Sequence, residues 1–158
     1  MTLRAVRIVK AKHAAAAFTG EGARLFGGRW NEPGAAMVYT SGSVSLAILE
    51  MLVHLEAQEL MKRYVLFDVT FDEKLVTHVD MASLPKTWRK SPVSRSVQRL
   101  GTAWLAGGTS AILRVPSALA PSEWNYLINP AHRDFEKISV GPGPAVRFDA
   151  RLIKSERN

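Results

Sequence analysis

A chain of 158 residues has the length of one domain, so we expect a single domain over residues 1–158. Its residues are 47% hydrophobic and 22% charged, which is typical of a globular protein with its own core. The absence of cysteine excludes disulfides, a thiolate nucleophile and cysteine-ligated metals. No apolar run approaches the length of a membrane span and no secretory signal is seen, so we expect a cytoplasmic protein that makes no membrane contact.

The charge of the chain is unusual, because 21 Lys and Arg against 14 Asp and Glu give a net charge of +7. Five of the cations fall in a stretch without an acid: Lys86, Arg89, Lys90, Arg95 and Arg99. A basic balance suits phosphate-bearing substrates, nucleic acid or an acidic protein partner. Trp88 is the one aromatic residue among these cations and no RNA-binding motif accompanies them, so a solvated face is the simplest interpretation. A binding surface for a protein partner or for nucleic acid remains an alternative interpretation.

The first half of the chain predicts short strands around a glycine-rich loop. Strands are expected at residues 5–9, 36–40 and 64–71, with 75–79 paired to the last of them. Five glycines within residues 19–34 indicate the loop. Residues 43–63 predict one long helix with serines at its start as N-caps.

The second half predicts one amphipathic helix and several further strands. Ser91 is the expected N-cap, Pro92 the first helical residue, and Gly107 and Gly108 the helix end. Strands are expected at residues 111–115, 137–140 and 146–153, whereas the polar residues 123–130 predict a turn-rich loop. Strands and helices mix without regular β-α-β alternation, which places the fold in the α+β class.

Familiar motifs of nucleotide binding and hydrolysis are missing. The glycine-rich loop lacks the third glycine of a dinucleotide fingerprint and the Lys–Ser/Thr pair of a P-loop. The four histidines show no spacing typical of a metal site, so no metal is expected.

Polar residues on the long predicted helix form the first candidate feature. Between residues 44 and 55 this helix is apolar nearly all round, which predicts that it is buried. Glu50 and His54 interrupt the apolar sequence at i and i+4, and Ser43 falls on the same face. The stripe is either the solvent side of the helix or a functional group held against the core.

Two further features lie in predicted loops. Arg29 follows Gly27 and Gly28, and glycines let a backbone approach a ligand whose phosphates a guanidinium can bind. A surface arginine beside a turn explains the same pattern. Ser117 follows Pro116 and precedes the polar residues 123–130, where turn chemistry is the simpler interpretation.

Short blocks of the sequence, taken in order, resemble the RES domain family over nearly the whole chain. The blocks that carry the resemblance are VRI at 6–8, GRWN at 28–31, VYTS at 38–41, SLAILE at 45–50, LVHL at 52–55, LPxxW at 84–88, LGxxWL at 100–105, VPS at 115–117, NYLINP at 125–130 and FDxRL at 148–152. The Arg, Glu and Ser that give the family its name look like Arg29, Glu50 and Ser117. Arg133 departs from the pattern, which has a proline after His132.

The resemblance implies an α+β fold similar to ADP-ribosyltransferase toxins, with a cleft for NAD. NAD is then a consumed substrate and no cofactor is needed. The resemblance also implies a toxin that cleaves the nicotinamide–ribose bond and gives the ADP-ribose to water, to phosphate or to a protein such as phosphoribosyl pyrophosphate synthetase. Its expected partner is an Xre-like helix-turn-helix antitoxin, which covers the active site and carries out the DNA binding of the pair.

For this chemistry the expected catalytic residues are Arg29, Tyr39, Glu50 and Ser117. The expected NAD-binding residues are Arg7, Arg29, Tyr39, Ser41, Asn125 and Asn129. An arginine pairs with the pyrophosphate, and the face of Tyr39 stacks on the cationic nicotinamide ring. Glu50 stabilises the positive charge that builds on the ribose as the bond breaks. The serines and asparagines hold ribose hydroxyls or the amide.

Position 48 bears on the acceptor of the ADP-ribose. Transferases of this type that modify proteins often carry Glu or Gln two residues before the catalytic Glu, whereas this chain has Ile48. The sequence therefore favours NAD degradation, with protein modification as the alternative. A basic nucleic-acid-binding toxin or ribonuclease is a more remote alternative, because no His or Lys constellation for phosphodiester cleavage is seen. Arg29, Tyr39 and Glu50 together argue against an inactive partner-binding module.

Overall fold

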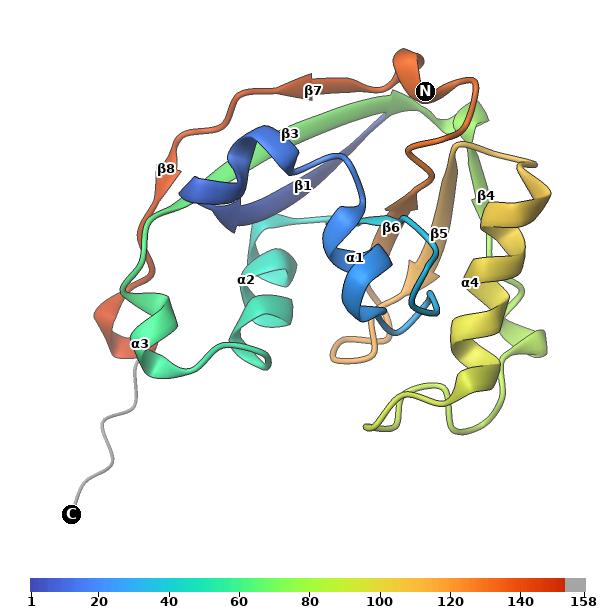
Figure 1. Cartoon of the computed structure of the whole chain (residues 1–158), viewed down its shortest axis with the longest axis horizontal. Helices are drawn as coiled ribbons and strands as arrows, with labels where there is room; N and C mark the ends of the chain where they lie inside the picture. The colour runs from blue at the N-terminus through green and yellow to red at the C-terminus, as the bar shows by residue number, and fades with distance from the viewer. Residues whose placement is uncertain (153–158) are drawn as a thin grey trace.

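Among the residues that the structure describes, eight strands form one mixed sheet, which arches over the helices beneath it (Figure 1). The computed structural model describes residues 1–152. The strands are β1 (Thr2–Lys10), β2 (Val38–Ser41), β3 (Tyr64–Asp72), β4 (Val76–His78), β5 (Ile112–Pro116), β6 (Trp124–Ile128), β7 (Ser139–Gly141) and β8 (Ala145–Val146). Their order is β4-β5-β6-β2-β1-β3-β7, and β8 also pairs with β3. Strands β4 and β5 run parallel, and the other pairs run antiparallel.

Within residues 1–152, the remaining regular elements are four α-helices and several short 3₁₀ segments. The α-helices are α1 (Glu21–Phe26), α2 (Val44–Leu52), α3 (Ala57–Leu60) and α4 (Arg95–Gly107). The 3₁₀ turns are Ala11–Ala16, Glu73–Leu75, Met81–Ser83, Phe135–Lys137 and Ala150–Leu152. The mixture of helices with a largely antiparallel sheet confirms the predicted α+β class.

Alternation along the strands sends side chains to two faces of the sheet. On β2, Val38 packs into a core with Ala5, Val69, Ile112 and Ile128. The neighbouring residue, Tyr39, contributes to the core on the opposite face, beneath α4.

Helices α2 and α4 cover the same face of the sheet. Val6 packs with Ala47 of α2, and Val115 packs with Val97 of α4. Between Val6 and Val115 the sheet register places Ser41 and Asn125 in one row across four strands. Polar residues in this row therefore lie on the side from which both helices approach.

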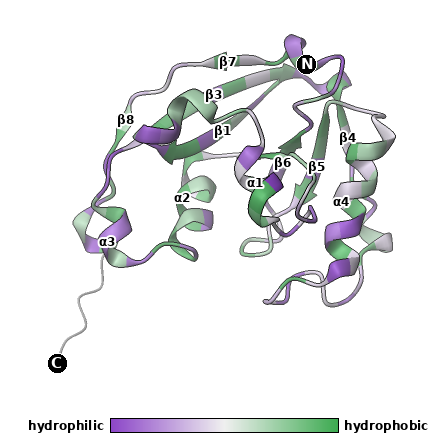
Figure 2. Cartoon of the chain, in the orientation of Figure 1, coloured by the Kyte–Doolittle hydropathy of each residue, from purple (hydrophilic) through white to green (hydrophobic). Residues whose placement is uncertain are grey.

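The long helix predicted over residues 43–63 is wrong as one element, because the structure has α2, a turn and then α3. A straight helix of that length would extend about 31 Å and overshoot the start of β3. The break brings Tyr64 back to the sheet, where its hydroxyl donates to the Glu59 carbonyl at 2.7 Å. Helix α2 is also less buried than predicted, since Leu49 is 40% and Val53 is 53% exposed. In Figure 2 the ribbon of α2 is coloured mainly as hydrophobic.

Strand β6 was not predicted, because residues 123–130 were interpreted as a turn-rich loop. Apart from Asn125, the strand consists of aromatic and aliphatic residues, which pack into the core. Tyr126 and Ile128 pack on one face and Leu127 on the other, while β2 and β5 pair with the two edges. Burial on both sides and both edges outweighs the turn preference of asparagine.

Several predicted boundaries and one pairing also differ. Helix α4 begins after Ser94 rather than at Pro92, while its predicted end is confirmed by the left-handed Gly108. Residues 19–34 contain α1, and the strand predicted at 36–40 begins at Val38. Strand β4 pairs with β5 rather than β3, because a 3₁₀ turn after β3 redirects the chain. Of the strand predicted at 146–153, only Val146 lies in a strand; residue 153 is outside the described residues.

Gly101 lets α4 pack directly on the backbone of the turn that carries Arg29. A Cβ at this position would lie 1.7 Å from the Trp30 carbonyl oxygen. We expect Gly101→Ala to force the helix away and to cost about 1–3 kcal/mol of unfolding free energy, measured by denaturant titration. Gly107→Ala is the control, because a Cβ there meets nothing within 4 Å. Equal midpoints for both variants would contradict this close packing.

Within residues 1–152 we find no helix with both the length and the apolar character needed to cross a membrane.

Candidate active site

The carboxylate of Glu50 is the centre of a polar cluster between α2 and the sheet. Its Oε1 accepts a hydrogen bond from the Ser117 hydroxyl at 2.7 Å and another from Asn125 Nδ2 at 2.8 Å. Ser117 lies 67 and Asn125 lies 75 residues away from Glu50 in the sequence. The fold thus brings together three of the predicted site residues. Ser41 lies next to Asn125, its partner across the β2–β6 ladder.

Local structure fixes the direction in which the Ser117 hydroxyl points. Ser117 is fully buried directly after β5, and its Oγ accepts hydrogen bonds from the backbone N–H groups of Leu119 and Ala120 at 3.1 and 3.2 Å. Because these two groups are donors, the single hydroxyl proton is available for Glu50. Asn125 is oriented in the same way, because the carboxylate accepts only from its NH₂ group. Both side chains therefore hold one carboxylate oxygen in place.

Arg29 projects from a tight turn between α1 and β2. Its Nη1 donates to the carbonyls of Trp88 and Lys90 at 2.8 and 3.0 Å, which ties the turn to the segment before α4. Burial lowers the pKa of Arg29 below its usual value, while nearby Glu50 and Tyr39 act in the opposite direction. The guanidinium is thus close to Glu50 without forming an ion pair with it.

Tyr39 stabilises the turn that carries Arg29 through hydrogen bonds to two of its residues. Its hydroxyl donates to Asn31 Oδ1 at 2.6 Å and accepts from the backbone N–H of Trp30 at 3.1 Å. Burial raises the pKa of Tyr39 above its usual value, so the phenol keeps the proton that it donates to Asn31. A Cβ at Gly28 would lie 2.5 Å from this hydroxyl oxygen, which explains the glycine before Arg29.

Two predicted NAD-binding residues lie apart from the Glu50 cluster. The Arg7 guanidinium bonds the carbonyls of Ala17 and Tyr39 at 2.7 and 2.9 Å, and burial lowers its pKa to about 10. Asn129 follows the opposite end of β6 from Asn125. Its Nδ2 donates to the Leu105 carbonyl at 3.4 Å, and its Oδ1 accepts from the Ala131 N–H at 3.0 Å.

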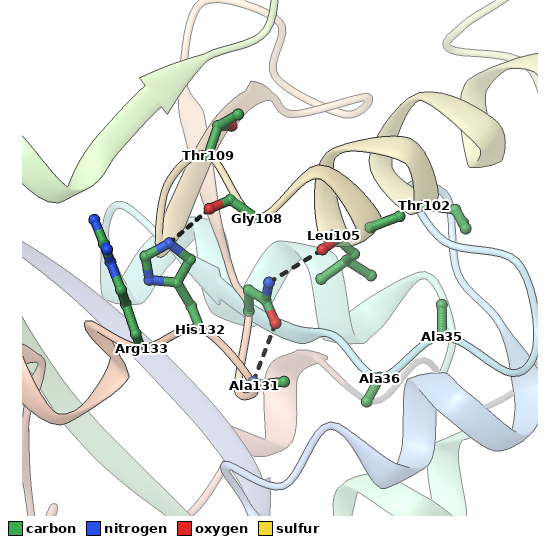
Figure 3. Close-up of a pocket in the computed structure, with 11 residues that line it drawn as sticks. Ala35, Ala36, Thr102, Leu105, Gly108, Thr109, Ala131, His132 and Arg133 are labelled. Carbon is green, nitrogen blue, oxygen red and sulfur yellow. Dashed lines mark hydrogen bonds between the residues drawn. The ribbon is translucent and has the colours of Figure 1, made fainter.

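Asn129 instead lines a cavity of about 800 Å³ at the C-terminal end of α4 (Figure 3). Thr102, Leu105, Thr109, His132 and Arg133 also line it. The His132 ring bonds the Gly108 carbonyl at 3.0 Å across this cavity. Its lining includes none of Arg29, Tyr39, Glu50 and Ser117, so volume alone does not locate the candidate active site.

The polar stripe predicted on α2 is reduced to Glu50 in the structure. Ser43 is the N-cap of α2 and accepts from the Leu46 N–H at 3.1 Å. His54 is exposed and follows the end of the helix. Sequence reasoning assigned no role to Asn31 or to the carbonyls after Pro85 that hold Arg29. The GRWN block was the available signal for Asn31. Over residues 1–152, no group of three or more His, Asp and Glu is placed to hold a metal.

The model of the RES domain matches residues 4–150, and the chain belongs to the RES domain family.

Curated relatives match over nearly their whole length. A protein of Yersinia enterocolitica named "Toxin Res" is 37% identical over 147 residues, covering 92% of this chain and 97% of the relative. A protein of Sphingobium named "Prs ADP-ribosylating toxin" is 36% identical over 139 residues, covering 86% of each chain.

A solved structure shares the fold. A chain in the crystal structure of the MbcT-MbcA toxin-antitoxin complex of M. tuberculosis matches with a TM-score of 0.76 at 19% identity. The match covers 96% of this chain and 87% of that one.

Proposed function

We propose that this chain is the toxin of a toxin–antitoxin pair and that it cleaves NAD at the nicotinamide–ribose bond. The observation that carries the proposal is the Glu50 carboxylate, held by Ser117 and Asn125 and lying near the Arg29 guanidinium. Family membership and relatives named as toxins support the same assignment. NAD is the substrate, and the reaction as proposed needs no cofactor.

In the proposed reaction, the bond between the ribose C1′ and the nicotinamide nitrogen breaks, and its electron pair leaves with nicotinamide. Positive charge then develops on the ribose ring, and a fixed carboxylate stabilises that charge. Ser117 and Asn125 occupy Oε1 of Glu50, so Oε2 is the oxygen available to face the sugar. An acceptor oxygen forms the new bond to C1′ and loses its proton.

Arg29 has the chemistry to bind the pyrophosphate of NAD. Its Nη1 is engaged by the carbonyls of Trp88 and Lys90, which leaves Nε and Nη2 to donate to phosphate oxygens. The guanidinium is partly buried, and the lower effective dielectric there strengthens such a contact. In this proposal Tyr39 supports the turn and offers its ring to the nicotinamide, while Ser41 contacts the ribose beside Asn125.

Water or phosphate is the acceptor that we propose, because Ile48 supplies no polar group to activate a protein side chain. Modification of a protein is the second candidate, and the ADP-ribosylating relative in Sphingobium favours it. The test is to incubate the purified protein with NAD, with and without cell extract, and to follow nicotinamide release and protein labelling. Nicotinamide release without extract supports NAD degradation. Release that requires extract and labels one protein supports the alternative, and no release in either case contradicts the proposal.

We propose an Xre-like antitoxin as the partner that covers this site. Leu49 precedes Glu50 on α2, Val53 is the C-cap of this helix, and both are exposed, as is Leu119 after Ser117. Exposed apolar side chains around a charged group suit the docking of a protein. An acidic group of the partner would then complement Arg29, and DNA binding would belong to the partner. Specific binding of operator DNA by this chain alone in a mobility-shift assay would contradict this division.

Removal of the Ser117 hydroxyl is expected to slow NAD cleavage about 10-fold in kcat, because one of two hydrogen bonds to the charged Glu50 is lost. Asn125 still holds Oε1, so the loss stays below that of removing the carboxylate. The measurement is nicotinamide release by Ser117→Ala. Ser122→Ala, in the exposed part of the same loop, is the control. Equal rates for the two variants would contradict the role of Ser117.

A further inference from the structure

We propose that Asn31 is a positioning residue, which fixes the turn that presents Arg29 and so fixes where the phosphates of NAD bind. The inference rests on the proposed function of Arg29. Asn31 contacts neither Glu50 nor Ser117 by any hydrogen bond of its own; it acts through the backbone that carries Arg29.

The turn itself is closed by Gly28 and Asn31. The Gly28 N–H donates to the Asn31 carbonyl at 3.0 Å, and the two residues form an isolated antiparallel bridge. Arg29 and Trp30 occupy the corner. Trp30 is 2% exposed and packs against Trp88, with ring centroids 6.3 Å apart. The neighbouring Arg29 reaches over the same segment, where it bonds the Trp88 carbonyl.

The side chain of Asn31 ties three segments to this turn. It is fully buried, and its Nδ2 donates to the carbonyls of Ala23 at 2.8 Å, Ala35 at 3.0 Å and Glu32 at 3.2 Å. Its Oδ1 accepts from the Tyr39 hydroxyl at 2.6 Å. Carbonyl oxygens require the NH₂ group to face them, so the amide has only one workable orientation. The network therefore joins α1, the turn and β2 through one side chain.

Contacts from α4 and β2 hold the turn from two further sides. From α4, Gln98 Nε2 donates to the Gly28 carbonyl at 3.0 Å, and Gly101 lies against the Trp30 carbonyl. From β2, the Tyr39 hydroxyl leaves no room for a Cβ at Gly28. A change at Asn31 thus moves the Arg29 backbone rather than an isolated side chain. A displacement of about 1 Å at a binding group can cost on the order of 10² in rate.

The variant that tests this role is Asn31→Asp, which keeps the shape and the acceptor for Tyr39. It replaces the NH₂ group with an oxygen that repels the carbonyls of Ala23 and Ala35. We expect kcat/KM for nicotinamide release to fall about 10²-fold. In an Arg29→Ala background, we expect the same substitution to lower kcat/KM less than about 3-fold, because the residue through which Asn31 acts is gone. Equal fold-losses in both backgrounds would overturn the proposal.

A second buried polar residue, Ser110, provides a control that distinguishes a positioning role in catalysis from a purely structural role. Ser110 is 7% exposed and bonds Thr77, Trp104 and the Ile112 carbonyl at 2.8 to 2.9 Å, beneath the far end of α4. We expect Ser110→Ala to lower the melting temperature as Asn31→Asp does, yet to leave kcat/KM unchanged. A loss of activity in Ser110→Ala equal to that in Asn31→Asp would make Asn31 merely structural. If Asn31→Asp does not fold, Asn31→Ser enters the same cycle.

An NMR readout on the Arg29 side chain needs no catalysis. With ¹⁵N-labelled arginine, the Arg29 guanidinium signals of the native protein are expected to show slow rotation, because Nη1 bonds two carbonyls. Asn31→Asp is expected to shift and broaden these signals, while Ser110→Ala leaves them unchanged. Unchanged Arg29 signals in Asn31→Asp would overturn the proposal. Absence of nicotinamide release by the native protein would instead contradict the proposed function, and the NMR comparison would still test Asn31.

Discussion

Glu50→Gln is expected to lower kcat for nicotinamide release by about 10²–10³, which corresponds to about 2.7–4 kcal/mol of transition-state stabilisation. The substitution keeps the side-chain shape, and the amide oxygen can still accept from Ser117 and Asn125. The folded structure is therefore expected to persist, with a melting temperature close to that of the native protein. What is lost is the negative charge that opposes the developing positive charge on the ribose.

The control for this prediction is Glu56→Gln, which removes an exposed carboxylate beyond the end of α2. It changes the net charge by the same amount and is expected to leave kcat unchanged. Near-native nicotinamide release by a folded Glu50→Gln would show that the carboxylate is not catalytic. An unfolded Glu50→Gln would show instead that the cluster serves stability.

Local patterns predicted the elements that depend on local interactions. The alternation in β3 and the paired glycines after α4 led to correct elements, because periodicity and left-handed turns are properties of neighbouring residues. Strand β6 escaped prediction because pairing with β2 and β5 stabilises it. The break after Leu52 depends likewise on where the chain must meet the sheet at Tyr64.

The candidate site likewise contains residues that the sequence identified and contacts that only the fold reveals. The residues Arg29, Glu50 and Ser117 were named from the family blocks, and the structure brings Glu50 and Ser117 into contact. Spacing in the sequence gave no indication that Asn125 bonds the same oxygen, since β5 and β6 had to be paired first. Asn129 was named from the same family block as Asn125, and the structure places the two residues at opposite ends of β6.

The role of the basic residues within 86–99 could be interpreted only with the fold in hand. The five cations within residues 86–99 are exposed in the structure, and none of them forms an ion pair within residues 1–152. Arg89 nonetheless bonds the Ala118 carbonyl at 3.0 Å, beside Ser117. Segment 84–94 therefore connects the Arg29 turn with the Ser117 loop, which the charge pattern alone did not indicate.

Arg29→Ala is expected to lower kcat/KM for NAD cleavage by about 10²–10³, because it removes the pyrophosphate contact and frees the carbonyls of Trp88 and Lys90. Arg24→Ala, which removes an exposed arginine paired with Glu21, is the control and is expected to retain native activity. Arg29→Lys is expected to recover only part of the loss, since an ammonium cannot hold both carbonyls and a phosphate in one plane.

The substrate itself distinguishes a phosphate-binding role for Arg29 from general damage to the site. Nicotinamide riboside carries the same bond to be cleaved but no pyrophosphate. If Arg29 acts on the phosphates, Arg29→Ala costs far less with nicotinamide riboside than with NAD, whereas Glu50→Gln costs the same with both substrates because its charge acts on the ribose. The measurement is nicotinamide release from each substrate by the native protein and the two variants. An equal loss for Arg29→Ala with both substrates would place Arg29 at the reacting bond rather than at the phosphates.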